Sequence, residues 1–279
     1  MFPQTIPVPD SMLLGITQEQ SGSELQAGAR AELLPSPLTN ALSSVRGRIV
    51  ARTMLFLVNE PLLVNFTKAR IPVLQAAIKR HLPKDKPQLT MVTVGVGFSP
   101  LGIWLAEENP NLRVIECDLP EVIRKRKARL RRAPDVHLPL NVQEVGIDFR
   151  KSSVDRVLAG ARADVFDFTG AYFTHAQLEN VARYLYMLLD ERGFCSCYLP
   201  WQPGLDRVRE AGRFFRNQVG EFPGIVGSED TIQRIFHAAG FQEVNVLYPS
   251  VVGRELGLET PILDAEVIVI ARRMESLYV

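Results

Sequence analysis

Two glycines and an aspartate, spaced as in a nucleoside-binding site, are the residues of this sequence best suited to chemistry. Gly95 and Gly97 close an apolar, β-branched run at 91–96, and Asp118 follows a second such run at 112–117. Glycine lets the backbone approach a ligand closely, and the helix start behind such a turn offers free N–H groups. Asp118 lies 21 positions after Gly97, where a carboxylate can accept hydrogen bonds from both ribose hydroxyls. The pattern predicts a nucleotide or nucleoside pocket.

The residues inside the turn narrow the choice of ligand. Pro100 stands where a pyrophosphate-binding loop needs an N–H donor, and proline instead pre-sets the first helical turn. A site without a diphosphate tolerates this proline better. S-adenosylmethionine therefore fits better than a dinucleotide, and a tight strand-to-helix turn without a ligand is the alternative.

The bulk properties exclude several classes of protein. Lys and Arg total 32 against 31 for Asp and Glu, so no global field draws the chain to nucleic acid. No segment has the apolar length of a membrane span. The three cysteines, Cys117, Cys195 and Cys197, lie in strand-like runs without the neighbours that would complete a metal set. We expect buried free thiols, no metal and a cytoplasmic enzyme whose partner is a small-molecule substrate.

The chain divides into three parts by composition. Residues 1–36 are rich in Pro, Gly, Ser and Gln and predict a flexible or draped arm, and residues 37–85 predict a helical cap with one helix near 71–80. Residues 86–279 alternate between strand and helix patterns. The expected strands are 91–96, 112–117, 142–146, 163–168, 193–199, 241–248 and 264–271.

The end of the chain decides the fold class. We expect only a loop between the last two strands, which suits an antiparallel pair because parallel neighbours need a long connection. A seven-stranded, mostly parallel sheet ending in such a pair is the layout of class I methyltransferases. The sequence therefore predicts an α/β, Rossmann-like class I methyltransferase fold with an N-terminal helical cap.

Four motifs resemble the leucine carboxyl methyltransferase family of S-adenosylmethionine enzymes. The glycine turn resembles that family's L-G-x-G. The other three are Lys68–Ile71, similar to an Ala-Arg-Val segment, Glu116–Ile123, similar to E-V-D-x-P-x-V-I, and Asp167–Thr174, similar to E-x-x-L-x-Y-x-T. The resemblance runs from about residue 38 to 246 and implies binding of S-adenosylmethionine.

The resemblance also implies roles for single residues around the methionine part of the cofactor. Arg70 would pair with its carboxylate, for which a guanidinium has the right shape, although a solvated arginine at a helix start has the same pattern. Gly95 and Gly97 would let the backbone approach. Asp167 stands where the family has a glutamate that contacts the amino group, one methylene longer. Arg46 matches, more weakly, an N-terminal arginine that closes over the ligand.

The nucleoside part has its own set of implied contacts. Asp118 would hold the ribose hydroxyls. Asp148 would accept from the adenine amine, or only cap the next helix, and Phe149 would add a backbone contact. Phe98 is an aromatic candidate beside the sulfonium, since rings stabilise cations.

A basic run at 124–132 raises the question of RNA. The run follows Leu119-Pro120 and lies on a predicted helix, so most of its charges are expected on an exposed helical face. Without accompanying aromatic residues, RNA binding is the minor interpretation.

Three hypotheses for the activity remain open. The first is methyl transfer to an oxygen or carboxylate of a small molecule, as in secondary metabolism. The second is cyclisation of S-adenosylmethionine itself to azetidine-2-carboxylic acid with release of methylthioadenosine, as in azetidine-2-carboxylate synthases. There the amine must be neutral, with Tyr172 or Asn141 as polar guide, unless Tyr172 belongs to the core and Asn141 to a turn. The third is a cofactor-binding protein without catalysis. The sequence names no acceptor and leaves a homodimer open.

Overall fold

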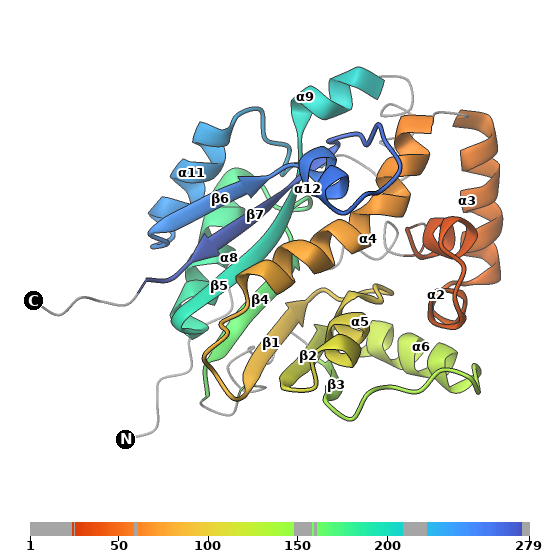
Figure 1. Ribbon diagram of the computed structural model, residues 1–279, viewed down its shortest axis with the longest axis horizontal. Coiled ribbons are helices and arrows are strands. Elements are labelled where there is room, and N and C mark those ends of the chain that lie inside the picture. The colour runs from red at the N-terminus through yellow and green to blue at the C-terminus, as the bar shows by residue number, and fades with distance from the viewer. Residues whose placement is uncertain are drawn as a thin grey trace, which may run out of the picture.

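A computed structural model describes residues 24, 26–58, 61–147, 158, 161–208 and 222–274. Within these residues a central sheet is flanked by helices on both faces (Figure 1). The strands are β1 (Leu89–Val94), β2 (Leu112–Asp118), β3 (Val142–Gly146), β4 (Ala163–Thr169), β5 (Leu189–Pro200), β6 (Glu243–Leu247) and β7 (Glu266–Arg272). The helices are α2 (Pro37–Leu42), α3 (Val45–Val58), α4 (Pro61–His81), α5 (Leu101–Glu108), α6 (Pro120–Arg131), α8 (His175–Leu188), α9 (Gln202–Leu205), α11 (Glu229–Ala238) and α12 (Pro249–Glu255), with a 3-10 turn η1 (Asp206–Val208).

The sheet confirms the strand prediction. Its seven strands run in the order β3-β2-β1-β4-β5-β7-β6, and β7 lies antiparallel between β5 and β6. The five strands β1 to β5 are parallel, so their carboxyl ends meet at one edge of the sheet. Ligands bind at that edge in open α/β sheets.

Two helices differ from the sequence prediction. The connection between β6 and β7 contains α12, where only a loop was expected, and the short helix was hidden because the proline at its first position resembles a loop signal. Helix α4 begins at Pro61 rather than near Ile71, and Pro72 lies inside it. The helix continues past the proline because its buried face packs against the sheet. This face includes Val73, Leu74, Ala77 and Ile78.

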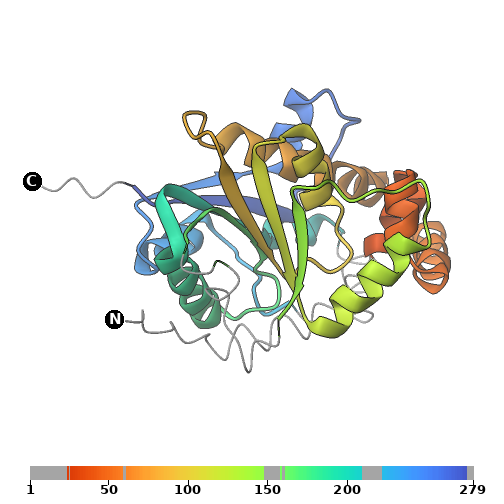
Figure 2. The same cartoon turned by 90° about the horizontal axis from the view of Figure 1, so that it is seen from below.

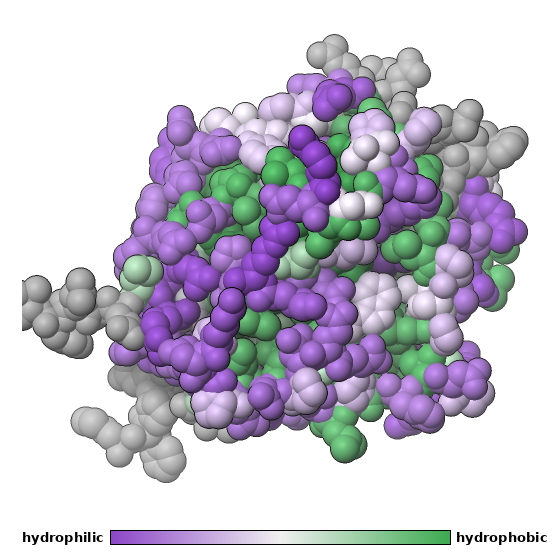
Figure 3. Space-filling view, in the orientation of Figure 1, coloured by the Kyte–Doolittle hydropathy of each residue, from purple (hydrophilic) through white to green (hydrophobic). Residues whose placement is uncertain are grey.

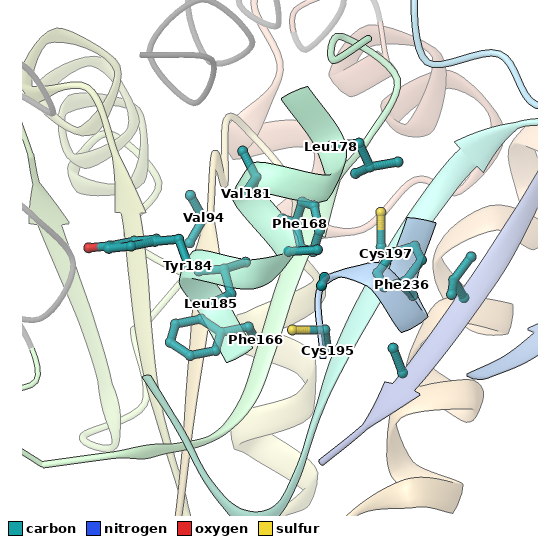
Figure 4. Close-up of a cluster of buried hydrophobic side chains, with 14 of the residues drawn as sticks. Val94, Phe166, Phe168, Leu178, Val181, Tyr184, Leu185, Cys195, Cys197 and Phe236 are labelled. Carbon is teal, nitrogen blue, oxygen red and sulfur yellow. The ribbon is translucent and has the colours of Figure 1, made fainter. Parts of the chain in front are cut away.

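Helices cover each face of the sheet with a separate apolar layer. Helices α4, α5 and α12 pack on one face, and α8 and α11 pack on the other, as Figure 2 shows from below. On the second face, Leu178, Val181 and Leu185 of α8 lie against sheet residues such as Phe166 and Phe168 (Figure 4). The three cysteines are buried free thiols, as expected, and burial raises the pKa of each.

An N-terminal group of helices packs at the β3 side of the sheet. Residues 26–33 are helical although the sequence placed them in an arm, and the arm itself stays a prediction for residues outside the described ranges. Gly28 packs on α3 so closely that a Cβ there would lie 2.2 Å from the carbonyl oxygen of Gly47. Helix α2 packs against α6 through a cluster that contains Leu38, Leu42 and Leu130.

One face of the molecule shows how the surface residues are distributed. Hydrophilic and hydrophobic residues intermix on the face shown in Figure 3. Among the described residues, no helix is long and apolar enough to cross a membrane.

Candidate functional site

The glycine turn and the end of β2 form one hydrogen-bonded unit. Gly95 and Gly97 have φ angles of 76° and 52°, which favour glycine because other residues are strained there. The Gly97 N–H donates to Asp118 Oδ2 at 2.7 Å, and the Leu119 N–H donates to Asp118 Oδ1 at 2.6 Å. Burial raises the pKa of Asp118 to about 6, against the effect of these two hydrogen bonds. The carboxylate is thus held by backbone groups with lone pairs left for a ligand.

A buried arginine supports the turn from below. Arg126 of α6 is 0% exposed, and its Nη1 donates to the carbonyl oxygens of Ser99 at 2.7 Å and Gly97 at 3.3 Å. Its Nη2 donates to Glu116 at 2.8 Å and its Nε to Glu144 at 2.7 Å. One guanidinium therefore joins α6, two strands and the turn.

The prediction that most charges of the basic run lie on an exposed helical face is wrong for Arg126. Arg126 points inward, and Arg129 is half-buried, with its guanidinium 3.9 Å from the centre of the Phe98 ring. Arg124 and Arg131 on the same helix are exposed, as expected. Because only packing decides which basic residues face inward, the run alone did not identify Arg126.

A row of polar side chains crosses the sheet just below the turn. Glu144, Glu116, Thr93, Asp167 and Ser196 are neighbours in register on β3, β2, β1, β4 and β5. Each has a buried oxygen to which the described part of the chain supplies no hydrogen-bond partner. The row lies on the face covered by α4 and α5, and Gly102 of α5 leaves room for it, since a Cβ there would lie 2.6 Å from Glu116 Oε1. Burial raises the pKa of Glu116 to about 7, although Arg126 opposes the shift.

Asp167 is the member of this row that the resemblance assigns to the methionine part of the cofactor. Its Oδ1 is unpartnered, and the residue is 2% exposed. Burial raises its pKa to about 7, while Ser196 and the charge of Arg70 oppose the shift. A buried carboxyl with a free oxygen can accept from a ligand's amino group.

Arg70 reaches the same edge from α4. Its Nε donates to Glu266 at 2.7 Å, its Nη1 donates to Gln26 at 3.1 Å, and its guanidinium lies 4.3 Å from the centre of the Tyr198 ring. Burial alone would lower the pKa of Arg70, but Glu266 and Tyr198 raise it above its ordinary value. Arg70 is therefore a fixed positive charge at the carboxyl ends of the strands.

The remaining predicted residues divide into three groups. Tyr172 is buried shortly after the end of β4, and the centre of its ring lies 6.0 Å from that of Phe222. It therefore follows the carboxyl edge of the parallel strands. Asp148 and Phe149 lie outside the described residues. Arg46 is exposed on α3, and Asn141 precedes β3 at the opposite edge of the sheet.

The placement of Asn141 corrects its predicted role as a polar guide. Its amide donates to the carbonyl oxygens of Ala106, Asn109 and Leu112. These bonds tie the loop before β3 to α5 and β2, so Asn141 is a structural residue. Its position before an expected strand was the available signal, because residues that start parallel strands lie away from the ligand edge.

One arginine at the site was not predicted. Arg30, on the helical segment 26–33, is 4% exposed, and its Nη2 donates to the carbonyl oxygen of Phe98 at 3.2 Å. The sequence signal was faint: Ala27, Arg30 and Ala31 have helical spacing within a segment of loop-like composition. Among the described residues, no group of three or more side chains could hold a metal ion.

Comparison with solved structures shows which known proteins have a similar architecture. No protein-family model and no curated protein matches the chain. A putative methyltransferase from Thermobifida fusca superposes with a TM-score of 0.60 at 16% identity, covering 89% of this chain and 94% of that one. A putative O-methyltransferase from Nostoc punctiforme gives 0.53 at 15% identity, covering 88% and 71%. The S-adenosylmethionine-dependent methyltransferase SibL gives 0.51 at 17% identity, covering 76% of this chain and 58% of that one.

The chain has the class I methyltransferase fold. The strand order, the antiparallel β7 and these superpositions agree on this point. In this fold, Gly97, Asp118, Asp167 and Arg70 all lie at the carboxyl edge of the parallel strands. The leucine carboxyl methyltransferase subtype stays a prediction.

Replacement of Arg126 tests the support beneath the turn. Arg126→Gln leaves Glu116 and Glu144 buried without their cation, and should lower the free energy of unfolding by about 3–5 kcal/mol. Arg124→Gln, at an exposed position of the same helix, should change it by less than about 0.5 kcal/mol. Urea unfolding of both variants measures the difference. Equal midpoints would show that the buried ion pairs do not stabilise this fold.

The pH dependence of stability tests the burial of Asp167. A raised pKa means that the folded state holds the proton more tightly, so this group's stabilisation is complete below 3.8 and is lost as the pH rises through about 7. Asp167→Asn removes the loss, and should be more stable than the original protein by about 1–3 kcal/mol at pH ~8 but not at pH ~4. Urea unfolding at both pH values checks this. A difference that is the same at both would mean that Asp167 does not titrate as described.

Proposed function

We propose that the protein is an S-adenosylmethionine-dependent methyltransferase that acts on an oxygen or carboxylate of a small molecule. The observation that carries the proposal is the glycine turn bonded to Asp118 at the carboxyl edge of a class I sheet. Asp118 would accept from the ribose hydroxyls, Asp167 from the amino group, and Arg70 would donate to the carboxylate. When bound, S-adenosylmethionine supplies an activated methyl group.

The start of α5 supports this cofactor over a dinucleotide. A pyrophosphate needs free N–H groups at a helix N-terminus. Here Pro100 has none, and the Leu101 N–H already donates to the Ser99 hydroxyl at 3.3 Å. The turn therefore offers backbone approach to a ligand without a phosphate cradle.

The protein's own part in methyl transfer is positioning. Phe98, Asp167 and Tyr172 are each less than a tenth exposed, so the site excludes water around the reacting atoms. The Phe98 ring packs in the cluster that joins α2, α5 and α6 and lies against the guanidinium of Arg129, and its proposed place is beside the sulfonium. Tyr172 at the rim is the proposed polar guide for the acceptor. We propose a cytoplasmic enzyme with a small-molecule partner, without a role for nucleic acid.

Asp167 supports a second candidate, cyclisation of S-adenosylmethionine to azetidine-2-carboxylic acid. In that reaction the amine must first lose a proton, and its nitrogen then bonds to the γ-carbon as the carbon–sulfur bond breaks to release methylthioadenosine. A buried carboxyl with a pKa of about 7 and a free oxygen can take that proton.

Replacement of Asp118 tests the cofactor site. Asp118→Ala should weaken binding of S-adenosylhomocysteine by roughly 10- to 100-fold, because hydrogen bonds to a charged group contribute about 1.5–3 kcal/mol. Asp118→Asn keeps the shape and serves as a milder variant, and the exposed Asp135→Ala is the matched control. Calorimetry measures all three. Unchanged affinity in Asp118→Ala would refute the assignment of the ribose contact.

Product analysis separates the candidate activities. We expect adenosylhomocysteine to form when the protein is incubated with S-adenosylmethionine and a pool of hydroxyl and carboxylate acceptors. Mass spectrometry also follows methylthioadenosine in a sample without acceptor. Methylthioadenosine above the buffer background there would favour cyclisation and overturn methyl transfer. Binding without either product would indicate a cofactor-binding protein without catalysis.

A further inference from the structure

Arg30 is a buried cation for which the described part of the chain supplies no anion. Its Nη2 donates to the carbonyl oxygen of Phe98 at 3.2 Å. The other buried or half-buried arginines around the turn all have carboxylate partners: Arg70 pairs with Glu266, Arg126 with Glu116 and Glu144, and Arg129 with Glu24. A buried charge is costly unless it is paired. Among the described residues, Arg30 is thus a buried cation without a carboxylate partner.

The surroundings of Arg30 are positive. Burial and the charges of Arg70 and Arg126 lower its pKa to about 9, while Tyr198 opposes the shift. Arg30 therefore stays protonated near neutral pH, beside two other guanidinium groups. A planar anion such as a carboxylate suits the parallel N–H donors of a guanidinium.

The predicted contacts of the cofactor's amino-acid part use Asp167 and Arg70, and leave Arg30 unassigned. The positive charge of Arg70 lowers the pKa of Asp167, and it also lowers the pKa of Arg30. The amino and carboxylate groups of one amino acid lie close together, so Asp167 and Arg70 suit the methionine part of the cofactor. S-adenosylmethionine brings a single carboxylate. Arg30 is then left for a second anion.

We propose that the methyl acceptor carries a carboxylate and that Arg30 binds it. The inference rests on the proposed function, and it names the class of acceptor. Arg30 belongs to the segment 26–33, which is tied to the turn by Phe98 and to α3 through the contact of Gly28 with Gly47. The acceptor's anion would therefore be held by an N-terminal element that contacts the glycine turn.

The test compares anionic and neutral probes in the presence of bound cofactor product. Protein saturated with S-adenosylhomocysteine is titrated with benzoate and phenylacetate, and with benzamide and phenylacetamide as neutral counterparts of similar shape. Calorimetry or ligand-observed NMR measures binding. The acids should bind at least about 10-fold more tightly than the amides, as expected for a charge-assisted contact. Equal binding of acids and amides would overturn the proposal.

Variants assign that preference to Arg30. Arg30→Gln should lose the preference for acids while its affinity for S-adenosylhomocysteine stays within about 2-fold, and Arg30→Lys should retain part of the preference. Arg124→Gln, at an exposed position of α6, is the control and should behave like the original protein. An Arg30→Gln protein that keeps the preference would overturn the proposal.

A further probe distinguishes the two sources of a carboxylate. Methylthioadenosine resembles S-adenosylhomocysteine without its amino-acid part. If Arg30→Gln weakens binding of S-adenosylhomocysteine but not of methylthioadenosine, Arg30 serves the cofactor's carboxylate and the acceptor inference is wrong. If the original protein binds neither compound, the proposed function itself fails, and the inference that rests on it falls too.

Discussion

The buried guanidinium of Arg126 is the interaction on which the candidate site depends. It pairs with Glu116 and Glu144 inside the molecule and donates to the carbonyl oxygens of Gly97 and Ser99. An ordinary turn of this kind exposes those carbonyls to water. Here a single side chain satisfies them and fixes the turn, which in turn presents the Gly97 N–H to Asp118. Helix α6, the strands and the glycine turn are therefore positioned together.

The polar row beneath the turn shows that this region is not built for stability alone. Five side chains in register across the sheet each bury an oxygen without a partner, within a sheet whose other layers are apolar. Unsatisfied buried groups cost free energy, and proteins tolerate them chiefly at functional sites. The same holds for Arg30, which is buried without a carboxylate partner among the described residues. These groups gather at the one edge where the class I fold binds ligands.

The regular part of the fold could be predicted well because it follows local patterns. Each strand of the sheet is a short apolar run between turn residues, so all seven were found, and the expectation of only a loop between the last two strands indicated the antiparallel end. The errors lie where tertiary packing overrides local preference. Helix α4 begins at Pro61 rather than near Ile71, and it continues through Pro72, whereas α12 is too short to show a helical period.

By itself the sequence determined the turn, since Gly95 and Gly97 need positive φ angles and Asp118 must end the next strand. The sequence also indicated that Arg70 and Asp167 lie near the carboxyl edge of the sheet, because their motifs border the predicted strands and helices there. Only the tertiary structure decided among similar residues: Arg126 rather than Arg124 within one basic run, and Arg30 rather than Arg46 among the N-terminal arginines. The physical reason is that a composition or a charge run specifies how many charges a helix carries. How the helix docks specifies which of them is buried.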